Sequence, residues 1–300
     1  MNQRFLAIGE CMVEMSPKGS SDYALSFAGD TFNTAWYLRQ QVSADLEVAY
    51  LTAVGDDVLS KRLTDFIQAS GIVPEVGVVR DRTLGLYMIS LVDGERSFQY
   101  WRDTSAARCL AEYLDPLKGL AKGDMAYFSG ITMAILTNEY RAILLHRLKQ
   151  IRVAGVTIVF DTNLRPKLWE DVDEMRQWVM QAAAVAEIVL PSFGDEMEFF
   201  GDTDKQATLQ RYQGTSDKQV IVKDGPNAVL FQGENGELEE YMPMLNPSPI
   251  DTTAAGDSFN AGFLAAYFKG LSPKEAVAAG CDLAHQVVSE CGALVSNERL

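Results

Sequence analysis

Residues 250–267 read IDTTAAGDSFNAGFLAAY, and the character of the chain changes within this stretch. Ala254, Ala255 and Gly256 form a loop of small side chains, whereas apolar residues recur at helical spacing from Asp257 onward. The first backbone N–H groups of a helix lack partners within the helix, and the helix dipole favours negative charge beside them. The sequence therefore predicts a phosphate site made of main-chain amides, in a loop that contains no lysine.

Asp257 would lie in the first turn of this helix, where the amides are expected to keep its carboxylate ionised at neutral pH. A carboxylate in that place can accept the proton of a hydroxyl group that attacks a phosphate. The alternative is that Asp257 only caps the helix, because aspartate is one of the preferred capping residues. Whether Asp257 is a general base or only a helix cap depends on the wider sequence pattern around it.

Short apolar runs alternate with amphipathic segments along most of the 300 residues. This alternation is typical of strand–helix–strand units, and it predicts a single α/β domain over residues 1–300 with a mostly parallel sheet. One helix is expected at residues 138–154, with Gly155 just beyond its C-terminus. The expected strands are residues 5–8, 48–54, 126–129, 156–161, 188–191 and 219–222.

Residues 85–101 read GLYMISLVDGERSFQYW and break this rhythm. Two alternating runs flank Asp93-Gly94, which predicts a β-hairpin with its turn at this pair. In that register Tyr87 lies opposite Tyr100, and Arg102 extends from the same face. The face is either a ligand-binding surface or a set of ordinary strand residues with an edge charge, and the hairpin alone leaves both open.

The composition, with 47% hydrophobic and 22% charged residues, is that of a globular protein, and no apolar run is long enough to cross a bilayer. The net charge of -15 argues against binding to nucleic acid or to an anionic membrane. The four cysteines and two histidines show no spacing typical of a disulfide framework, a zinc site or a catalytic triad. The N-terminus lacks the features of a secretory signal, so a cytoplasmic location is expected.

Residues 251–262, DTTAAGDSFNAG, look like the C-terminal signature of the ribokinase-like (PfkB-type) carbohydrate kinases, with a match at every restricted position. Residues 28–35, AGDTFNTA, resemble the N-terminal signature more loosely, and a polar helix cap is the alternative there. The resemblance implies a three-layer α/β/α sandwich with a small β-sheet lid, whose strands come from approximately residues 11–27 and 84–103. It also implies ATP, Mg²⁺ and, as in some relatives, K⁺.

Within this family the chain is similar over its whole length to kinases of the sugar acid 2-keto-3-deoxygluconate, notably in IGECMVE from Ile8 and FDTNLRPKLW from Phe160. An arginine offers a carboxylate a planar, bidentate partner, which suits such a substrate. A loop arginine paired with a surface carboxylate is the alternative for Arg165. The resemblance implies a substrate pocket of Gly29, Asp30, Thr31, Phe32, Asn33, Tyr87, Tyr100, Trp101, Arg102, Arg165 and Asp257.

For the phosphoryl transfer, the resemblance implies Asp257 as the base and the amides of Ala254, Ala255 and Gly256 as the groups that stabilise charge. It implies a nucleotide site of Asn163, Leu164, Arg165, Lys223, Asp224, Gly225, Pro226, Asn227, Ala228, Ala254, Ala255, Gly256 and Asp257. No metal ligand is assigned. Residues 191–196, PSFGDE, correspond to an element with which many relatives organise Mg²⁺ and water, and its acidic residue is either Asp195 or Glu196. A K⁺ site around Asp251, Thr253 and residues 289–293 is left open.

These observations together predict ATP-dependent phosphorylation of 2-keto-3-deoxygluconate at its terminal hydroxyl group, with Asp257 as general base. The alternatives are a kinase of a neutral sugar such as fructose or ribose, and a catalytically silent sensor of sugar acids. The expected partners are the sugar acid and ATP, together with further copies of this chain in a homo-oligomer. The sequence does not separate 2-keto-3-deoxygluconate from its galactonate epimer.

Overall fold

The main sheet is built from strands that are spread along most of the chain. A computed structural model describes residues 3–19, 22–92, 95–214 and 218–296. The seven strands of the sheet lie in the order β11-β10-β9-β8-β1-β4-β5, and every pairing between them is parallel. The strands are β1 (Gln3–Ile8), β4 (Leu46–Val54), β5 (Val73–Val78), β8 (Met125–Ser129), β9 (Thr157–Asp161), β10 (Ile188–Val189) and β11 (Gln219–Val220). Six of them coincide with the expected strands, so the predicted α/β class is confirmed.

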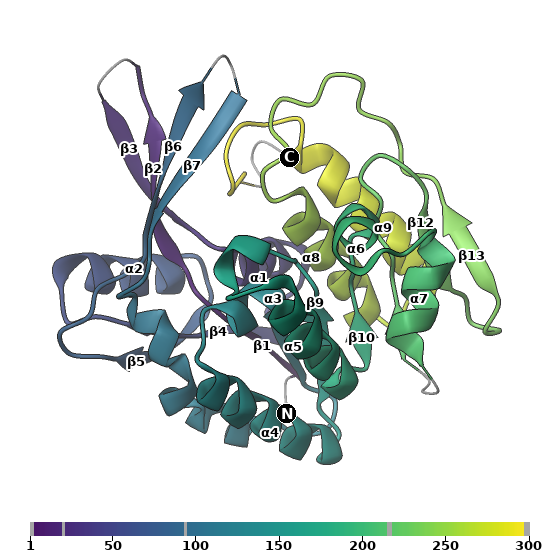
Figure 1. Cartoon of the computed structure of the whole chain (residues 1–300), viewed down its shortest axis with the longest axis horizontal. Helices are drawn as coiled ribbons and strands as arrows, with labels where there is room; N and C mark the ends of the chain where they lie inside the picture. The colour runs from purple at the N-terminus through teal and green to yellow at the C-terminus, as the bar shows by residue number, and fades with distance from the viewer. Residues whose placement is uncertain (1–2, 20–21, 93–94, 215–217, 297–300) are drawn as a thin grey trace.

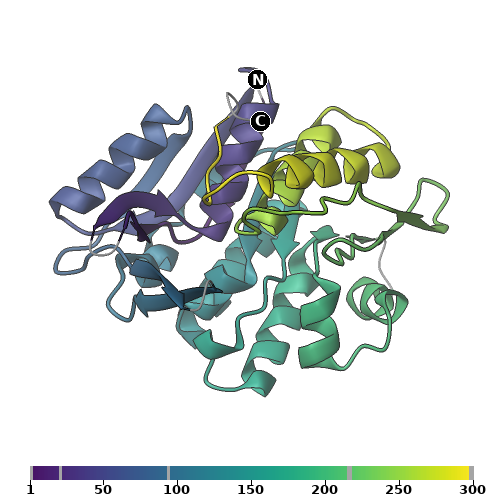
Figure 2. The ribbon, with the colours of Figure 1, turned by 90° about the horizontal axis from the view of Figure 1, so that it is seen from above.

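Helices cover both faces of this sheet, because successive side chains of a strand point to opposite sides. In β1, Leu6 and Ile8 join one buried cluster, whereas Phe5 and Ala7 join the other. The first face carries α3 (Gly130–Ala134), α4 (Asn138–Val153), α5 (Val172–Val185), α6 (Phe193–Phe200) and α7 (Lys205–Gln213). The second carries α1 (Asp30–Gln41), α2 (Val58–Ala69), α8 (Ala255–Phe268) and α9 (Pro273–Val287). Figure 2 shows the yellow α9 and the teal α4 and α5 on opposite sides.

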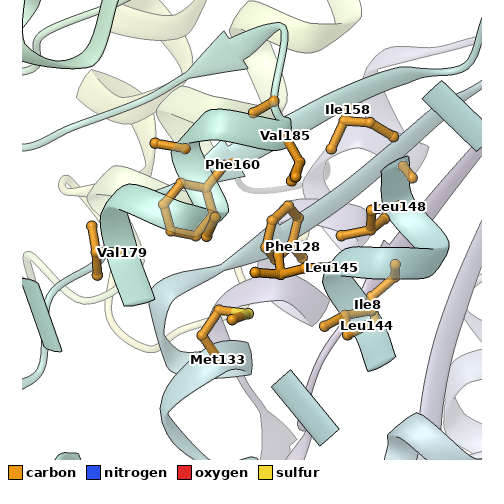
Figure 3. Close-up of a cluster of buried hydrophobic side chains, with 14 of the residues drawn as sticks. Ile8, Phe128, Met133, Leu144, Leu145, Leu148, Ile158, Phe160, Val179 and Val185 are labelled. Carbon is orange, nitrogen blue, oxygen red and sulfur yellow. The ribbon is translucent and has the colours of Figure 1, made fainter. Parts of the chain in front are cut away.

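The core on the first face fixes the ends of β8 and β9 (Figure 3). The rings of Phe128 and Phe160 lie 4.8 Å apart between centroids, and Leu144 and Leu148 of α4 are fully buried in the same cluster. Burying each such side chain contributes about 1.5–3 kcal/mol. As predicted, α4 ends just before Gly155, whose φ of 91° lies in the left-handed region that favours glycine.

A separate four-stranded sheet, β3-β2-β6-β7, stands away from the layered body (Figure 1). Its strands are β2 (Met12–Pro17), β3 (Tyr23–Ala28), β6 (Leu86–Val92) and β7 (Glu95–Trp101). The pairing of Tyr87 with Tyr100 confirms the predicted register, while the predicted turn at Asp93-Gly94 lies outside the described residues. We call this sheet the lid. Strand β3 runs one residue past the first of the two predicted lid segments, and the other three strands lie within these segments.

The remaining elements are short. A two-stranded sheet of β12 (Val229–Gln232) and β13 (Leu238–Tyr241) follows β11, and the 3₁₀ helices are η1 (Ala106–Tyr113), η2 (Asp115–Gly119) and η3 (Pro166–Leu168). Within the described ranges, none of the helices is long and apolar enough to cross a membrane.

Candidate active site

The carboxyl ends of the parallel strands bring several polar residues to one edge of the sheet. Glu10 follows β1, Asp161 ends β9, and Lys223 follows β11. The N-terminus of α8 lies at the same edge, since a Cβ atom placed on Gly256 would be 3.9 Å from Nζ of Lys223. In open α/β sheets ligands bind at this carboxyl edge, so we place the candidate site here.

The start of α8 differs slightly from the prediction. The helix begins at Ala255, preceded by Ala254, whose φ of 61° is unusual for a residue other than glycine. The N–H of Ala255 donates to the carbonyl of Thr252 at 3.2 Å, so this amide is already used in a turn. The N–H groups of Gly256 and Asp257 follow in the first turn, where the helix supplies no partner. Among the predicted amides, Gly256 is therefore better placed than Ala255 for a phosphate.

Asp257 does not cap α8. Its Oδ2 accepts a hydrogen bond of 2.8 Å from Nδ2 of Asn33 in α1, and the N-terminus of α8 has no side-chain cap. Asn33 in turn accepts from the N–H of Gly29 at 3.2 Å. The two predicted signatures thus meet through Asn33 and Asp257. A Cβ atom on Gly29 would lie 2.1 Å from the carbonyl oxygen of Glu10, so only glycine allows this approach.

The charge state of Asp257 differs from the prediction. Burial raises the pKa of its carboxyl, the negative charge of Asp30 adds to that effect, and the hydrogen bond from Asn33 opposes it, leaving the pKa at about 8. The charge of Asp161 raises this pKa as well, whereas Lys223 lowers it. The prediction of a carboxylate ionised at neutral pH was therefore wrong, because it counted the helix amides but neither the burial of the side chain nor the neighbouring acids.

Lys223 brings a cation to the helix N-terminus, although the loop itself has no lysine. Its Nζ donates to Oδ1 of Asp161 at 3.2 Å and to Oδ1 of Asn260 at 3.0 Å. Asn260 donates to Asp161 at 2.9 Å and to the hydroxyl of Tyr127 at 3.0 Å, and all four residues are buried. The sequence contained a signal for this network, because Asn260 lies three residues after Asp257 and shares its helix face.

In the loop after β9, Arg165 pairs with a carboxylate, as in the alternative interpretation of this residue. Nη1 of Arg165 lies 3.7 Å from Oδ2 of Asp195, and the Arg165 side chain is half exposed. Asn163, with a φ of 30°, donates to Oδ2 of Asp30 at 2.8 Å. The loop is thus tied to α1 by Asn163 and to α6 by Arg165, while Leu164 is buried. A sugar contact of Arg165 remains a prediction.

The lid carries the predicted aromatic face. The rings of Tyr87 and Tyr100 lie 5.8 Å apart, and Cζ of Arg102 lies 5.9 Å from the Tyr100 ring. Arg102 is buried and paired with Glu10, so it is not a solvated edge charge. Trp101 is exposed, and because successive strand residues point to opposite faces, its ring lies on the face away from Tyr100. Its contact with the sugar stays a prediction.

A pocket of about 470 Å³ opens beside the N-terminus of α8. Its polar end includes Lys223 and Gly256, and its remaining wall is mostly apolar. Such a pocket fits a flat base with a phosphate chain at one end. Of the predicted nucleotide turn, Asn227 and Ala228 do not line it. The sequence did not indicate several of its walls, which are Pro243, Met244, Leu245, Pro249, Phe259, Ala284 and Val288.

Comparison with known proteins shows the family of this chain. The sequence profile described as pfkB family carbohydrate kinase matches residues 2–300. The chain belongs to this family. It is 38% identical over 299 residues to the 2-dehydro-3-deoxygluconokinase of Haemophilus influenzae, covering 96% of this chain and 94% of the relative. It is 35% identical over 308 residues to that of Escherichia coli K12, covering 100% and 99%.

Solved structures support the fold of this PfkB carbohydrate kinase. The PfkB protein from Polaromonas sp. JS666 superimposes with a TM-score of 0.85 at 24% identity, covering 97% of this chain and 96% of that one. The fructokinase with bound ATP from Xylella fastidiosa gives a TM-score of 0.82 at 19% identity, covering 98% and 94%. The predicted ribokinase-like sandwich with a β-sheet lid is therefore confirmed.

The two acids between which the sequence left the choice open have different surroundings in this PfkB kinase. Glu196 is fully buried and accepts from Thr162, Arg211 and Tyr212 at 2.8–2.9 Å, so its oxygens are occupied. Asp195 is half-buried; burial raises its pKa, and the guanidinium of Arg165 lowers it. Among the described residues no cluster of three or more potential metal ligands occurs. Mg²⁺ commonly needs only one or two carboxylates besides the phosphates of its nucleotide, and Asp195 fits that requirement.

The segments around which a K⁺ site was left open are joined by hydrogen bonds of Asp251. Oδ1 of Asp251 accepts from the N–H of Thr253 at 3.0 Å, and Oδ2 accepts from the N–H of Gly292 at 2.7 Å. Asp251 therefore joins the segment before α8 to the chain after α9. Activation by K⁺ stays a prediction.

Proposed function

We propose that this PfkB kinase transfers the terminal phosphoryl group of ATP to the 6-hydroxyl group of 2-keto-3-deoxygluconate, which is the same compound as 2-dehydro-3-deoxygluconate. The product is 2-keto-3-deoxy-6-phosphogluconate. The position of Asp257 carries the proposal. It is bonded to Asn33, which follows the lid strand β3, and it adjoins Gly256, which lines the pocket. One carboxylate thus stands between the sugar side and the nucleotide side of the site.

The proposed chemistry follows from the groups around Asp257. Its carboxylate accepts the proton of the 6-hydroxyl group as the oxygen attacks the terminal phosphorus of ATP, and ADP leaves. The N–H groups at the start of α8 and the ammonium of Lys223 stabilise the charge on the transferring group. Mg²⁺, held on the protein side by Asp195, would supply further positive charge to the phosphates.

The lid supports a sugar acid as the substrate. Tyr87, Tyr100 and Arg102 share one face, which offers flat surfaces for a carbon chain and a cation for a carboxylate. Relatives at 35% and 38% identity carry the name 2-dehydro-3-deoxygluconokinase. A fructokinase from Vibrio alginolyticus is a more distant relative, at 27% identity, so a neutral sugar is the second candidate.

The deciding experiment is a coupled assay of ADP release with Mg²⁺-ATP. It compares 2-keto-3-deoxygluconate, its galactonate epimer, fructose, ribose and no sugar at equal concentrations. Turnover confined to the two keto acids is the expected result. Turnover on fructose or ribose would overturn the substrate but not the kinase, and silence on every sugar would favour the sensor.

Arg102→Leu tests the role of the lid cation. We expect kcat/KM for 2-keto-3-deoxygluconate to fall on the order of 100-fold, because the substrate carboxylate would face a buried apolar side chain. For a neutral sugar the loss should be much smaller. Steady-state kinetics on both sugars check this prediction, and an equal loss on the two would contradict the proposed contact.

The raised pKa of Asp257 predicts a pH dependence. Below pH 8 much of the carboxyl is protonated and cannot accept a proton, so kcat/KM should rise with pH and level off above about 8. The folded chain also holds this proton more tightly than the unfolded chain, whose carboxyl titrates near 3.8. The unfolding free energy should therefore fall between about pH 4 and 8, and this fall should be smaller in Asp257→Asn. A flat kinetic profile from pH 6 to 9 would contradict the assignment.

A further inference from the structure

Glu10 is the first acid of the IGECMVE block, and the site described above gives it no role. Its side chain is 1% exposed, and Oε2 accepts a hydrogen bond from Nη2 of Arg102, whose side chain is 8% exposed. Oε1 accepts from the hydroxyl of Ser105. Both oxygens of Glu10 are therefore bonded to the chain segment that leaves the lid strand β7.

The buried ion pair of Glu10 and Arg102 is an inefficient way to stabilise the folded chain. Removing two charges from water costs free energy that their mutual attraction often only just offsets. Nε of Arg102 is also buried, without a hydrogen-bond partner in the part of the chain that the structure describes. An unsatisfied buried donor adds a further cost. A pair held at such a cost, beside the predicted sugar site, points to a functional role.

Gly85 leaves the room that this pair needs. It precedes Leu86, which pairs with Trp101, so it lies across the lid from Arg102. A Cβ atom on Gly85 would lie 2.7 Å from Oε1 of Glu10. Any side chain at this position would therefore displace the carboxylate of Glu10.

We propose that Glu10 is a positioning residue for sugar binding, which fixes the guanidinium of Arg102 on the face that carries Tyr87 and Tyr100. The N–H groups of an arginine form a rigid fork, so one bond to Glu10 fixes the direction of the others. An arginine already held in one rotamer loses less conformational freedom when the sugar binds. This inference rests on the proposed function, because it takes Arg102 as a sugar contact.

Glu10→Gln tests the proposal, since it keeps the shape of the side chain but removes its charge. We expect the KM for the sugar to rise about tenfold, while the KM for ATP and kcat change by less than about twofold. The kinetics use the sugar that the wild-type enzyme turns over best. The assay of the wild-type enzyme on several sugars thus tests the proposed substrate. The ratio of the sugar KM between variant and wild type tests the role of Glu10. An unchanged KM for the sugar would overturn the proposal.

A double-mutant cycle separates positioning from a general effect. In an Arg102→Leu background, Glu10→Gln should cause no further rise in the sugar KM, because Glu10 acts only through Arg102. Equal effects in both backgrounds would overturn the proposal. Gly85→Ala is a second variant that displaces the carboxylate without removing it, and it should raise the sugar KM in the same way.

Glu174→Gln provides the matched control. Glu174 pairs with Arg141 at 2.6 Å between α5 and α4, in an ion pair whose side chains are 18% and 6% exposed. This variant should lower the thermal stability and leave the sugar KM unchanged. A comparable rise in KM would show that loss of a buried ion pair is enough, and would overturn the specific role of Glu10.

Discussion

Asp257→Asn should reduce kcat by roughly 10²–10⁴-fold, the contribution typical of general acid–base catalysis. The amide retains the shape of the side chain, but it cannot take the proton of the sugar hydroxyl. Binding of ATP should stay within about threefold of the wild type, because the pocket walls and the amides of α8 are unchanged. Single-turnover assays of ADP release and calorimetric titration with ATP measure the two quantities separately.

Asp204→Asn is the control for this prediction. Asp204 caps α7 by accepting from the N–H of Ala207 at 2.8 Å, which is the purely structural role that Asp257 could have had. The control should lose about 0.5–2 kcal/mol of stability and keep its kcat. If Asp257→Asn behaves like Asp204→Asn, with lower stability and comparable turnover, the assignment of the base is wrong.

The parts of the fold that were predictable depend on local chemistry. The strands of the main sheet are short apolar runs, Gly155 ends α4 with its left-handed conformation, and the pairing of Tyr87 with Tyr100 follows from an Asp-Gly pair between two alternating runs. The pairing of β2 with β6 joins distant segments, and no local signal encodes it. Conformations of single residues, such as the left-handed Ala254 at the start of α8, were not predictable either.

The candidate site shows the same limit. Asp257 and Asn33 were found through their signatures, but the pKa of Asp257 depends first on its burial and then on the charges of Asp30 and Asp161, which belong to two other elements. Glu196 accepts a hydrogen bond from Arg211, a residue of the next helix, and spacing along the sequence did not indicate this contact. Charges that converge only in the folded chain set the electrostatics, and spacing along the sequence does not reveal them.

Lys223→Gln should reduce kcat by roughly 10²–10³-fold, the loss typical for one donor that stabilises a developing charge. An ammonium group has three donors, and Asp161 and Asn260 occupy two of them. The third can reach a phosphate held at the start of α8, because Nζ lies beside Gly256 and lines the pocket. Glutamine keeps a donor for Asp161 but supplies no positive charge. Rapid-quench measurement of the phosphorylated sugar tests the chemical step directly.

The pH profile distinguishes this role from a structural one. Lys223 lowers the pKa of Asp257, so Lys223→Gln should move the rise in kcat/KM to higher pH. Lys205→Gln is the control, since Nζ of Lys205 donates to the carbonyl of Ala228 at 2.6 Å and supports the same turn without lining the pocket. It should leave the profile in place. If both variants lose activity equally without a shift in the profile, Lys223 only holds the turn, and the amides of α8 must stabilise the transferring phosphoryl group without it.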